Sequence, residues 1–326
     1  MIVRRAFSLI ELILVVTVLA ALLSLLLPAV QASRAAARRS VCRQHLKELS
    51  LAGLSFHSAQ GHFPPGLDQA KFTTPPIYRG TSLFAFLLPY VEESNLARDW
   101  DYERPLANAE GALRSRAATC LAVYLCPSDD LDATPVRVGD NFFGRTSYGG
   151  NGGSRSYYPD LATTDGIFHT TGPASDPLPD QCPIMLSEVL DGTSHTLLFG
   201  ERSHRDDHWE SFVESGWAES LEYLGRWSAL GGKKRIGDVT LSTFAPLNYR
   251  LPFDFEGRDM VQPALNGSRD FQYYEDLRVC AYGSEHAGGV HVAFVDGCVR
   301  FLSNGTSDSV LQAAGTRAGE ELVHEP

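Results

Sequence analysis

The 326-residue chain lacks several common signatures of metal, nucleotide and nucleic-acid binding. None of its cysteines stands in a CxxC pair, so the sequence has no local thiolate pair for a structural zinc ion. The glycine-rich stretch 145–153 is not followed by Lys-Ser or Lys-Thr, which excludes a phosphate-binding loop. With a formal net charge of −11, the chain lacks the basic excess that a nucleic-acid partner requires, and we expect none.

Acidic residues are scarce at the start of the chain, where Glu11 is the only one before position 46. The acidic excess lies downstream. The same early stretch is rich in arginine: Arg4, Arg5, Arg34, Arg38, Arg39 and Arg43. Overall, 44% of residues are hydrophobic and 21% are charged, which is typical of a folded body. A basic, apolar start before an acidic body indicates that the two parts meet different surroundings.

Charged side chains are missing from residues 12–30 (LILVVTVLAALLSLLLPAV). As a helix this segment would span about 28 Å at about 1.5 Å per residue, close to the ~30 Å hydrocarbon core of a bilayer. Arg4 and Arg5 before it favour a cytoplasmic N-terminus with the body on the far side. Three other interpretations are a signal peptide cut after Ala32, a twin-arginine export signal and a plain membrane anchor.

Glu11 counts against those three interpretations. A carboxylate in a membrane helix is unfavourable by about 2.5–3.5 kcal/mol on insertion scales, and neither an anchor nor an export signal has a use for it. Cleavage between Ala6 and Phe7 would leave a free amine on Phe7, close to Glu11 in the sequence. In a bundle of parallel helices, Glu11 could meet a neighbour's amine. At about 4 Å and a dielectric near 20 this attraction is about 4 kcal/mol, enough to offset insertion.

Residues 4–30 (RRAFSLIELILVVTVLAALLSLLLPAV) resemble the leader of type IV pilins and pseudopilins. In that family, basic residues and a small residue precede Phe-Ser/Thr-Leu-Ile-Glu and an apolar helix. The resemblance implies cleavage after Ala6 by a prepilin peptidase, methylation of Phe7 and an assembly role for Glu11. Pro28 matches the proline that bends many such helices. The family usually has Gly before the cut, where this chain has Ala6, and this departure could slow processing.

The helical pattern continues beyond the apolar segment. Apolar residues recur along one stripe at helical spacing: Cys42, Leu46, Leu49, Gly53 and Phe56. We therefore expect a single helix that bends at Pro28, runs to about Gln60 and packs its second half against the body. The sequence Phe63-Pro64-Pro65-Gly66 should end it.

Shorter elements are expected in the body. The patterns predict a buried apolar run at 81–90, a short strand running into a turn at 121–130, a glycine-rich loop at 145–153 and a strand at 196–199. Alternating apolar residues on both sides of Asp296-Gly297 predict a hairpin: Val290, Val292, Phe294, Val299 and Phe301.

These elements predict an α+β fold, in which a long N-terminal helix packs on a large, mainly antiparallel β body. The expected boundaries are a leader (1–6), a transmembrane and assembly helix (7–30), its soluble continuation (31–61), a globular body (62–303) and a frayed tail (304–326).

The even cysteine count favours disulfides if the body is exported, with six candidates: Cys42, Cys120, Cys126, Cys182, Cys280 and Cys298. We expect Cys280 to pair with Cys298, because both flank the predicted hairpin.

His286 and the Asp296-Gly297 turn could form an acid–base pair. Because no nucleophile or second carboxylate stands at a meaningful spacing, we favour a buried histidine that bonds a loop and a turn that fixes the register. The segment resembles the H-x9-DG signature that ends a large bacterial family combining a prepilin-type N-terminus with a domain of unknown function. The segments YLCPSD, TSYGGNGG and DGTSHTLLFGE have counterparts there. The resemblance implies an exported, pseudopilin-like component and assigns no reaction.

Two groups of side chains could hold a metal, but we expect none. Aspartates in turn-rich segments could bind calcium, yet they lack calcium-loop spacing, and such aspartates more often cap backbone amides. They are Asp129, Asp130, Asp165 and Asp191. His204 and His208, with Asp206 and Asp207 between them, would share a face of a helix, but the segment reads as a polar loop.

The sequence therefore predicts a structural subunit without enzymatic activity or a cofactor. Its expected partners are a prepilin peptidase, other pilin-like subunits and the inner membrane, and its expected destination is a filament or a type II secretion pseudopilus. The body would lie in the periplasm or at the cell surface. The rival hypothesis is a membrane-tethered ligand-binding protein or hydrolase centred on His286 or on the aromatic region 204–227.

Overall fold

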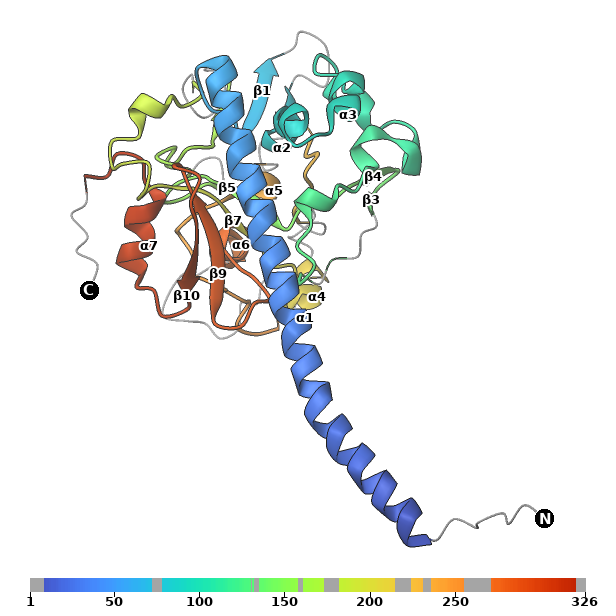
Figure 1. Ribbon diagram of the computed structural model, residues 1–326. Coiled ribbons are helices and arrows are strands. Elements are labelled where there is room, and N and C mark those ends of the chain that lie inside the picture. Colours follow the sequence, from blue (N-terminus) through green and yellow to red (C-terminus); the bar gives the residue numbers. More distant parts are fainter. Residues whose placement is uncertain are drawn as a thin grey trace.

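The computed structural model describes residues 9–71, 78–129, 131, 135–157, 161–172, 182–214, 224–230, 236–254 and 271–320. Ala6, Phe7 and Asp130 lie outside the described residues. The first element is helix α1 (Leu9–Gln60), which is 52 residues long and continues through Pro28. Figure 1 shows α1 crossing the body and projecting well beyond it towards the N-terminus. The predicted end of the helix at Gln60 is confirmed.

The two halves of α1 differ in what covers them. No residue in the most apolar stretch of the helix is buried, and the length and composition of the helix suffice to cross a membrane. The second half is buried along the predicted stripe, which includes Cys42, Leu46 and Phe56. Gly53 lies in that stripe, where a Cβ atom would sit 3.3 Å from the Phe199 ring. The glycine therefore lets the helix approach the body closely.

A five-stranded sheet forms the centre of the body, in the order β10-β9-β7-β5-β8. Its strands are β5 (Tyr148–Asn151), β7 (Leu197–Glu201), β8 (Thr240–Leu241), β9 (Gly289–Phe294) and β10 (Val299–Ser303). All neighbours are antiparallel except β5 and β8, which are parallel. The predicted strand at 196–199 and the predicted hairpin correspond to β7 and to β9–β10.

Both faces of this sheet are covered. On one face, Ala293 and Phe199 belong to a core cluster that includes Leu46 and Leu49 of α1. On the other face, Val290 and its neighbours pack around Leu311 of helix α7 (Asp308–Gly315). Strand β9 is therefore buried on both faces, whereas β10 is a partly exposed edge strand.

Smaller elements surround the central sheet. A three-stranded sheet joins β1 (Leu67–Lys71) to β2 (Tyr78–Ser82) and β6 (Thr170–Thr171), and β3 (Val136–Val138) pairs with β4 (Asn141–Phe143). The described residues also form the α-helices α2 (Leu83–Leu87), α3 (Ser94–Asp99), α4 (Trp209–Glu214), α5 (Ile236–Val239) and α6 (Phe271–Cys280). The 3-10 helices are η1 (Leu88–Tyr90), η2 (Pro105–Ala109), η3 (Ala112–Arg114), η4 (Arg116–Ala118), η5 (Ala122–Tyr124) and η6 (Leu186–Glu188). One long helix followed by mixed sheets and helices confirms the α+β class.

Three local predictions were wrong. The segment 121–129 is no strand, because it forms η5 and a turn. The glycine-rich stretch is no loop, because it contributes the buried strand β5. A Cβ atom at Gly150 would lie 2.4 Å from Phe168, so the glycines there permit close packing of other side chains onto the strand. The segment after Asn304 does not fray throughout, because α7 docks on the sheet through Leu311.

The Asp296-Gly297 turn has the predicted conformation, with a positive φ of 82° at Gly297. The Asp296 carboxylate accepts a hydrogen bond from the Cys298 amide at 2.8 Å. Lys47 of α1 donates to the Gly297 carbonyl oxygen at 2.6 Å. The turn therefore fixes the hairpin register and also attaches the hairpin to the long helix.

Candidate functional site

A disulfide joins the long helix to the body at the first buried turn of α1. It links Cys42 to Cys126, which follows η5, across a sequence separation of 84 residues. The predicted pair of Cys280 and Cys298 is wrong. Cys280 ends helix α6 in a buried position, where its thiol contacts Asp276, whereas Cys298 is exposed within the hairpin turn. The two residues lie on different elements and do not flank one hairpin.

Burial raises the pKa of the Cys280 thiol to about 12, with the Asp276 carboxylate adding to the effect. Such a thiol stays protonated and unreactive at neutral pH. Cys120 and Cys182 are also free thiols, half-buried and exposed respectively. Of the six candidates, only Cys42 and Cys126 therefore form a disulfide in the described part of the chain.

A buried carboxylate lies beside this disulfide. Glu201 is the last residue of β7 and is 1% exposed. His286 Nε2 lies 3.1 Å from Glu201 Oε1, and the backbone amide of His291 donates to Glu201 Oε2 at 2.7 Å. Burial alone would raise the pKa of the Glu201 carboxyl, but the hydrogen bonds and charges of His286 and His291 outweigh it and lower the pKa. Glu201 is therefore a carboxylate in a dry environment.

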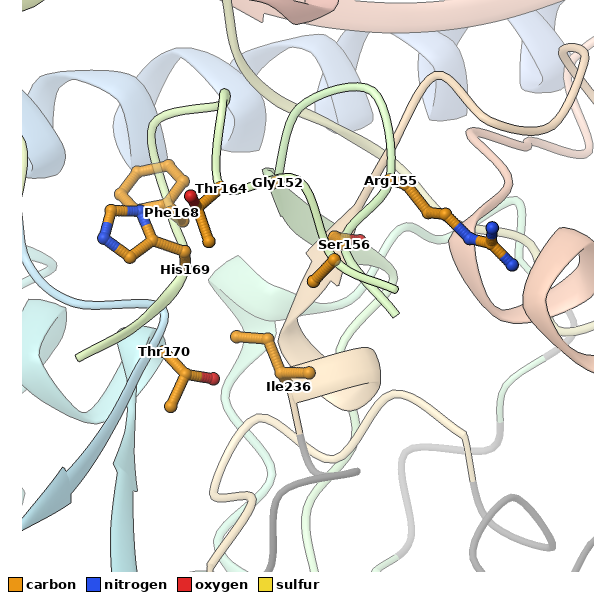
Figure 2. Close-up of a pocket in the computed structure, with 9 residues that line it drawn as sticks. Gly152, Arg155, Ser156, Thr164, Phe168, His169, Thr170 and Ile236 are labelled. Atoms are coloured by element: carbon orange, nitrogen blue, oxygen red, sulfur yellow. The ribbon is translucent and has the colours of Figure 1, made fainter. Parts of the chain in front are cut away.

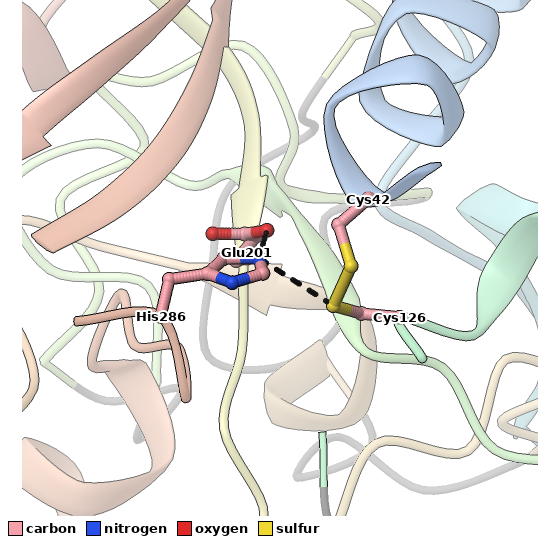
Figure 3. A group of neighbouring side chains, drawn as sticks. All are labelled: Cys42, Cys126, Glu201 and His286. Carbon is pink, nitrogen blue, oxygen red and sulfur yellow. Dashed lines mark hydrogen bonds and ion pairs between the residues drawn. A yellow bond between two sulfur atoms is a disulfide. The ribbon is translucent and has the colours of Figure 1, made fainter. Parts of the chain in front are cut away.

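The same histidine faces the disulfide. Figure 3 shows the side chains of Cys42, Cys126, Glu201 and His286 converging from separate elements. His286 Nε2 lies 3.8 Å from Cys126 Sγ, and all four side chains are buried. His286 is thus a buried, bonded histidine as predicted, but its partner is Glu201 and not the exposed Asp296.

The second histidine connects this cluster to the basic surface of α1. His291 Nδ1 lies 3.3 Å from Glu201 Oε2, and Arg39 Nε donates to His291 Nε2 at 3.4 Å. The Arg39 guanidinium also lies 3.9 Å from the centre of the Phe301 ring. An open groove of about 470 Å³ runs beside Arg39, and Arg43 helps to line it.

The predicted metal candidates do not gather into one site. Asp129 Oδ2 lies 2.7 Å from Nδ1 of His204, and this pair is buried. Burial would raise the pKa of Asp129, but His204 lowers it; the pKa of His204 is lowered by burial in spite of Asp129. His208 instead contacts Asp254 at 2.8 Å. The two histidines lie in a loop and a turn, as the sequence predicted, and point to different partners.

Of the other turn aspartates, Asp165 and Asp191 lie in the described residues and bond the protein itself. The Asp165 carboxylate accepts from the Ser154 amide at 2.8 Å and from the Thr163 hydroxyl at 2.7 Å. The Asp191 carboxylate accepts from the backbone amides of Gly319 and Glu320 at 2.7 and 2.9 Å. These contacts are those of aspartates that cap turns.

A small cavity lies near His169, away from the disulfide. Figure 2 shows Phe168, His169, Ser156 and Ile236 around it, with the Arg155 guanidinium extending away from the other labelled side chains. Its volume of about 10 Å³ is enough for one water molecule and too small for a substrate. His169 is 7% exposed, and burial lowers its pKa to about 4, although its bond to the Cys182 carbonyl opposes the shift.

The sequence segments that predicted a family meet at the disulfide. YLCPSD supplies Cys126, DGTSHTLLFGE supplies Glu201, and the H-x9-DG segment supplies His286. A family model described as "Protein of unknown function (DUF1559)" matches residues 31–309, well over half of the chain. The chain belongs to the DUF1559 family. No curated protein and no solved structure matches it.

The DUF1559 match confirms the predicted domain of unknown function and begins directly after the apolar segment 12–30. It therefore includes the buried half of α1, the central sheet and the cluster around Glu201. Glu201 lies in the segment DGTSHTLLFGE, but the sequence motifs do not single it out as a site residue. The available signal was an acidic residue at the end of a wholly apolar strand, a position that requires a buried partner.

Proposed function

We propose that this DUF1559 protein is a pilin-like structural subunit, processed by a prepilin peptidase and assembled with other pilin-like subunits into a filament or secretion-system pseudopilus. The supporting observation is the single helix α1, which has no buried residue along its most apolar stretch and is buried in the body along its second half. An apolar surface of this extent needs lipid or other apolar helices as its surroundings. The helix thus supports both a single-pass precursor and a bundle of subunits.

Glu11 carries the assembly step of the proposal. It lies in the exposed part of α1, next to apolar residues such as Leu12 and Ile13. In the membrane precursor its carboxylate is unfavourable, and beside the methylated amine of a neighbour's Phe7 it is neutralised. The acidic body, attached to the other end of α1, would then be displayed outside the cytoplasm.

Mass spectrometry of the mature N-terminus tests the processing. The expected result is a chain that begins at methylated Phe7. A chain that begins at Ser33 would identify a cleaved signal peptide, and one that retains Met1 would identify an anchor; either result contradicts the proposal.

Substitution of Glu11 tests the assembly. Glu11→Ala should leave membrane insertion intact and abolish higher-order assembly, measured by cross-linking in membranes and sedimentation of sheared filaments. Glu48→Ala is the matched control, because Glu48 is an exposed glutamate on the buried half of the same helix. Normal assembly of the Glu11→Ala protein would contradict the mechanism.

A further inference from the structure

Four side chains of the kinds that bind zinc converge where α1 meets the body (Figure 3). One sulfur, nitrogen or oxygen atom from each of Cys42, Cys126, Glu201 and His286 lies within 4.8 Å of all the others. We propose that these four residues form a zinc site in the reduced protein, and that the Cys42–Cys126 disulfide closes this site when the protein is oxidised. The sequence does not predict this site, because its ligands come from four distant segments and no CxxC pair marks it.

The present distances already approach those of a tetrahedral zinc site. With bonds of about 2.3 Å to sulfur and about 2.0–2.1 Å to nitrogen and oxygen, a nitrogen and an oxygen ligand lie ~3.3 Å apart, and a nitrogen and a sulfur ligand ~3.6 Å apart. His286 Nε2 is 3.1 Å from Glu201 Oε1 and 3.8 Å from Cys126 Sγ. After reduction, the two sulfurs need to separate only to about 3.8 Å. Their Cα atoms, 5.0 Å apart, permit this by side-chain rotation.

The surroundings support a bound cation. The His291 backbone amide holds Glu201 Oε2 at 2.7 Å, so Oε1 is the oxygen turned towards the site. Two thiolates and one carboxylate would leave one negative charge around Zn²⁺ and a neutral imidazole. The Arg39 guanidinium, bonded to His291 behind Glu201, lies on the side where it offsets that charge. The four ligands are buried, which excludes competing water.

A dithiol reductant can convert the Cys42–Cys126 disulfide into the two thiols that the zinc site needs. A dithiol passes two electrons and two protons to the disulfide, the S–S bond breaks, and the dithiol closes to its own disulfide. Zn²⁺ then displaces the two thiol protons to solvent. His286 keeps one proton, which moves from Nε2 to Nδ1 when Nε2 binds the metal. A newly made chain whose thiols have not yet been oxidised reaches the same state without a reductant.

Metal titration of the full-length protein in detergent tests the site. The chain carries Cys182→Ser and Cys298→Ser, which remove the two exposed thiols as sources of adventitious binding. After anaerobic reduction with a phosphine, Co²⁺ should give the visible absorption of a tetrahedral thiolate site, and Zn²⁺ should displace it at one ion per chain. The oxidised protein should give neither signal.

Ligand variants decide whether the four residues act together. In the same background, Cys42→Ser with Cys126→Ser should abolish Co²⁺ absorption, and Glu201→Gln and His286→Ala should each weaken affinity about tenfold or more. Re-formation of the Cys42–Cys126 disulfide on oxidation shows that Glu201→Gln and His286→Ala retain the fold. The proposal is overturned if the reduced parent binds no metal, if the oxidised parent binds it equally well, or if folded Glu201→Gln and His286→Ala proteins bind it as tightly as the parent.

Discussion

Helix α1 places two apolar surfaces on one continuous element, and only the second is covered by the described part of the chain. Leu22 in the first half is 52% exposed, whereas Leu46 in the second half is fully buried. Both halves are helical, so helix formation alone does not decide what each half does. The first half has a surface suited to lipid or another subunit, and the second half is part of the hydrophobic core of the body.

The largest difference between the two halves is expected in the free energy of unfolding after truncation of a leucine in each half. Leu46→Ala should lower the free energy of unfolding of the body by about 2–5 kcal/mol, because it leaves a cavity in the core. Leu22→Ala should change it by less than about 0.5 kcal/mol. Denaturant titration in detergent can follow the fluorescence of Trp100 and Trp227, whose rings lie 5.2 Å apart in the core. Equal losses in both variants would refute the division of the helix.

The disulfide should contribute the next largest effect, since it fixes the start of the buried half. Cys42→Ser with Cys126→Ser removes a cross-link over 84 residues and should destabilise the body by about 2–4 kcal/mol. Cys182→Ser, at an exposed free thiol, is the control. Calorimetry should show a lower melting temperature in the double variant alone, and an unchanged value there would show that α1 is held by packing.

Acid should weaken the body and leave the exposed half of α1 helical. The pKa of His169 falls from 6.5 to about 4 on folding, because of burial, so the unfolded chain binds a proton that the folded chain does not. The contribution of His169 to stability is therefore complete above pH 6.5 and is lost, by about 3 kcal/mol, as the pH falls towards 4.

His169→Gln should make the total decline smaller by this amount, because glutamine can still donate to the Cys182 carbonyl but takes up no proton. His195→Gln, at an exposed site, should leave the total decline unchanged. Denaturant titrations between pH 4 and 7 provide the measurement. A decline of the same size in the His169→Gln protein would assign the pH dependence to other groups.

The smallest effect is expected where the hairpin turn meets α1. Lys47→Met removes the bond to the Gly297 carbonyl and should destabilise the hairpin by about 1 kcal/mol. Arg114→Met, at an exposed position in η3, is the control. Hydrogen exchange at the amides of residues 297–303 should quicken only in the Lys47 variant; an unchanged rate would mean that the turn needs no support from the helix.

Local patterns predicted the elements whose burial follows a simple period. The stripe from Cys42 to Phe56 and the alternation around Asp296-Gly297 predicted α1 and the hairpin, because the period of the apolar residues is visible within each element itself. The same reasoning failed for β5, whose glycines resemble a loop. Their small size matters only once Phe168 and Leu83, remote in sequence, pack against Gly150.

The cluster around the disulfide could not be predicted from local patterns, because its residues are far apart in sequence and meet only in the folded chain. The sequence predicts a Cys280–Cys298 pair because both flank the hairpin, whereas the true bond joins Cys42 to Cys126 through the docking of α1. Likewise, His286 was compared with Asp296 because both belong to one motif. Its actual partner, Glu201, reaches it through the pairing of β7 with β9.

The position of the disulfide has a mechanical consequence. A helix of 52 residues is about 78 Å long, and the covalent link at Cys42 lies where the helix first enters the body. Tension applied along the exposed half would pass through Cys126 into the body before it reached Lys47 or Leu49. With the bond intact, the helix cannot leave the body, because Cys42 stays covalently joined to Cys126. Once the bond is reduced, the helix can peel from the body one turn at a time.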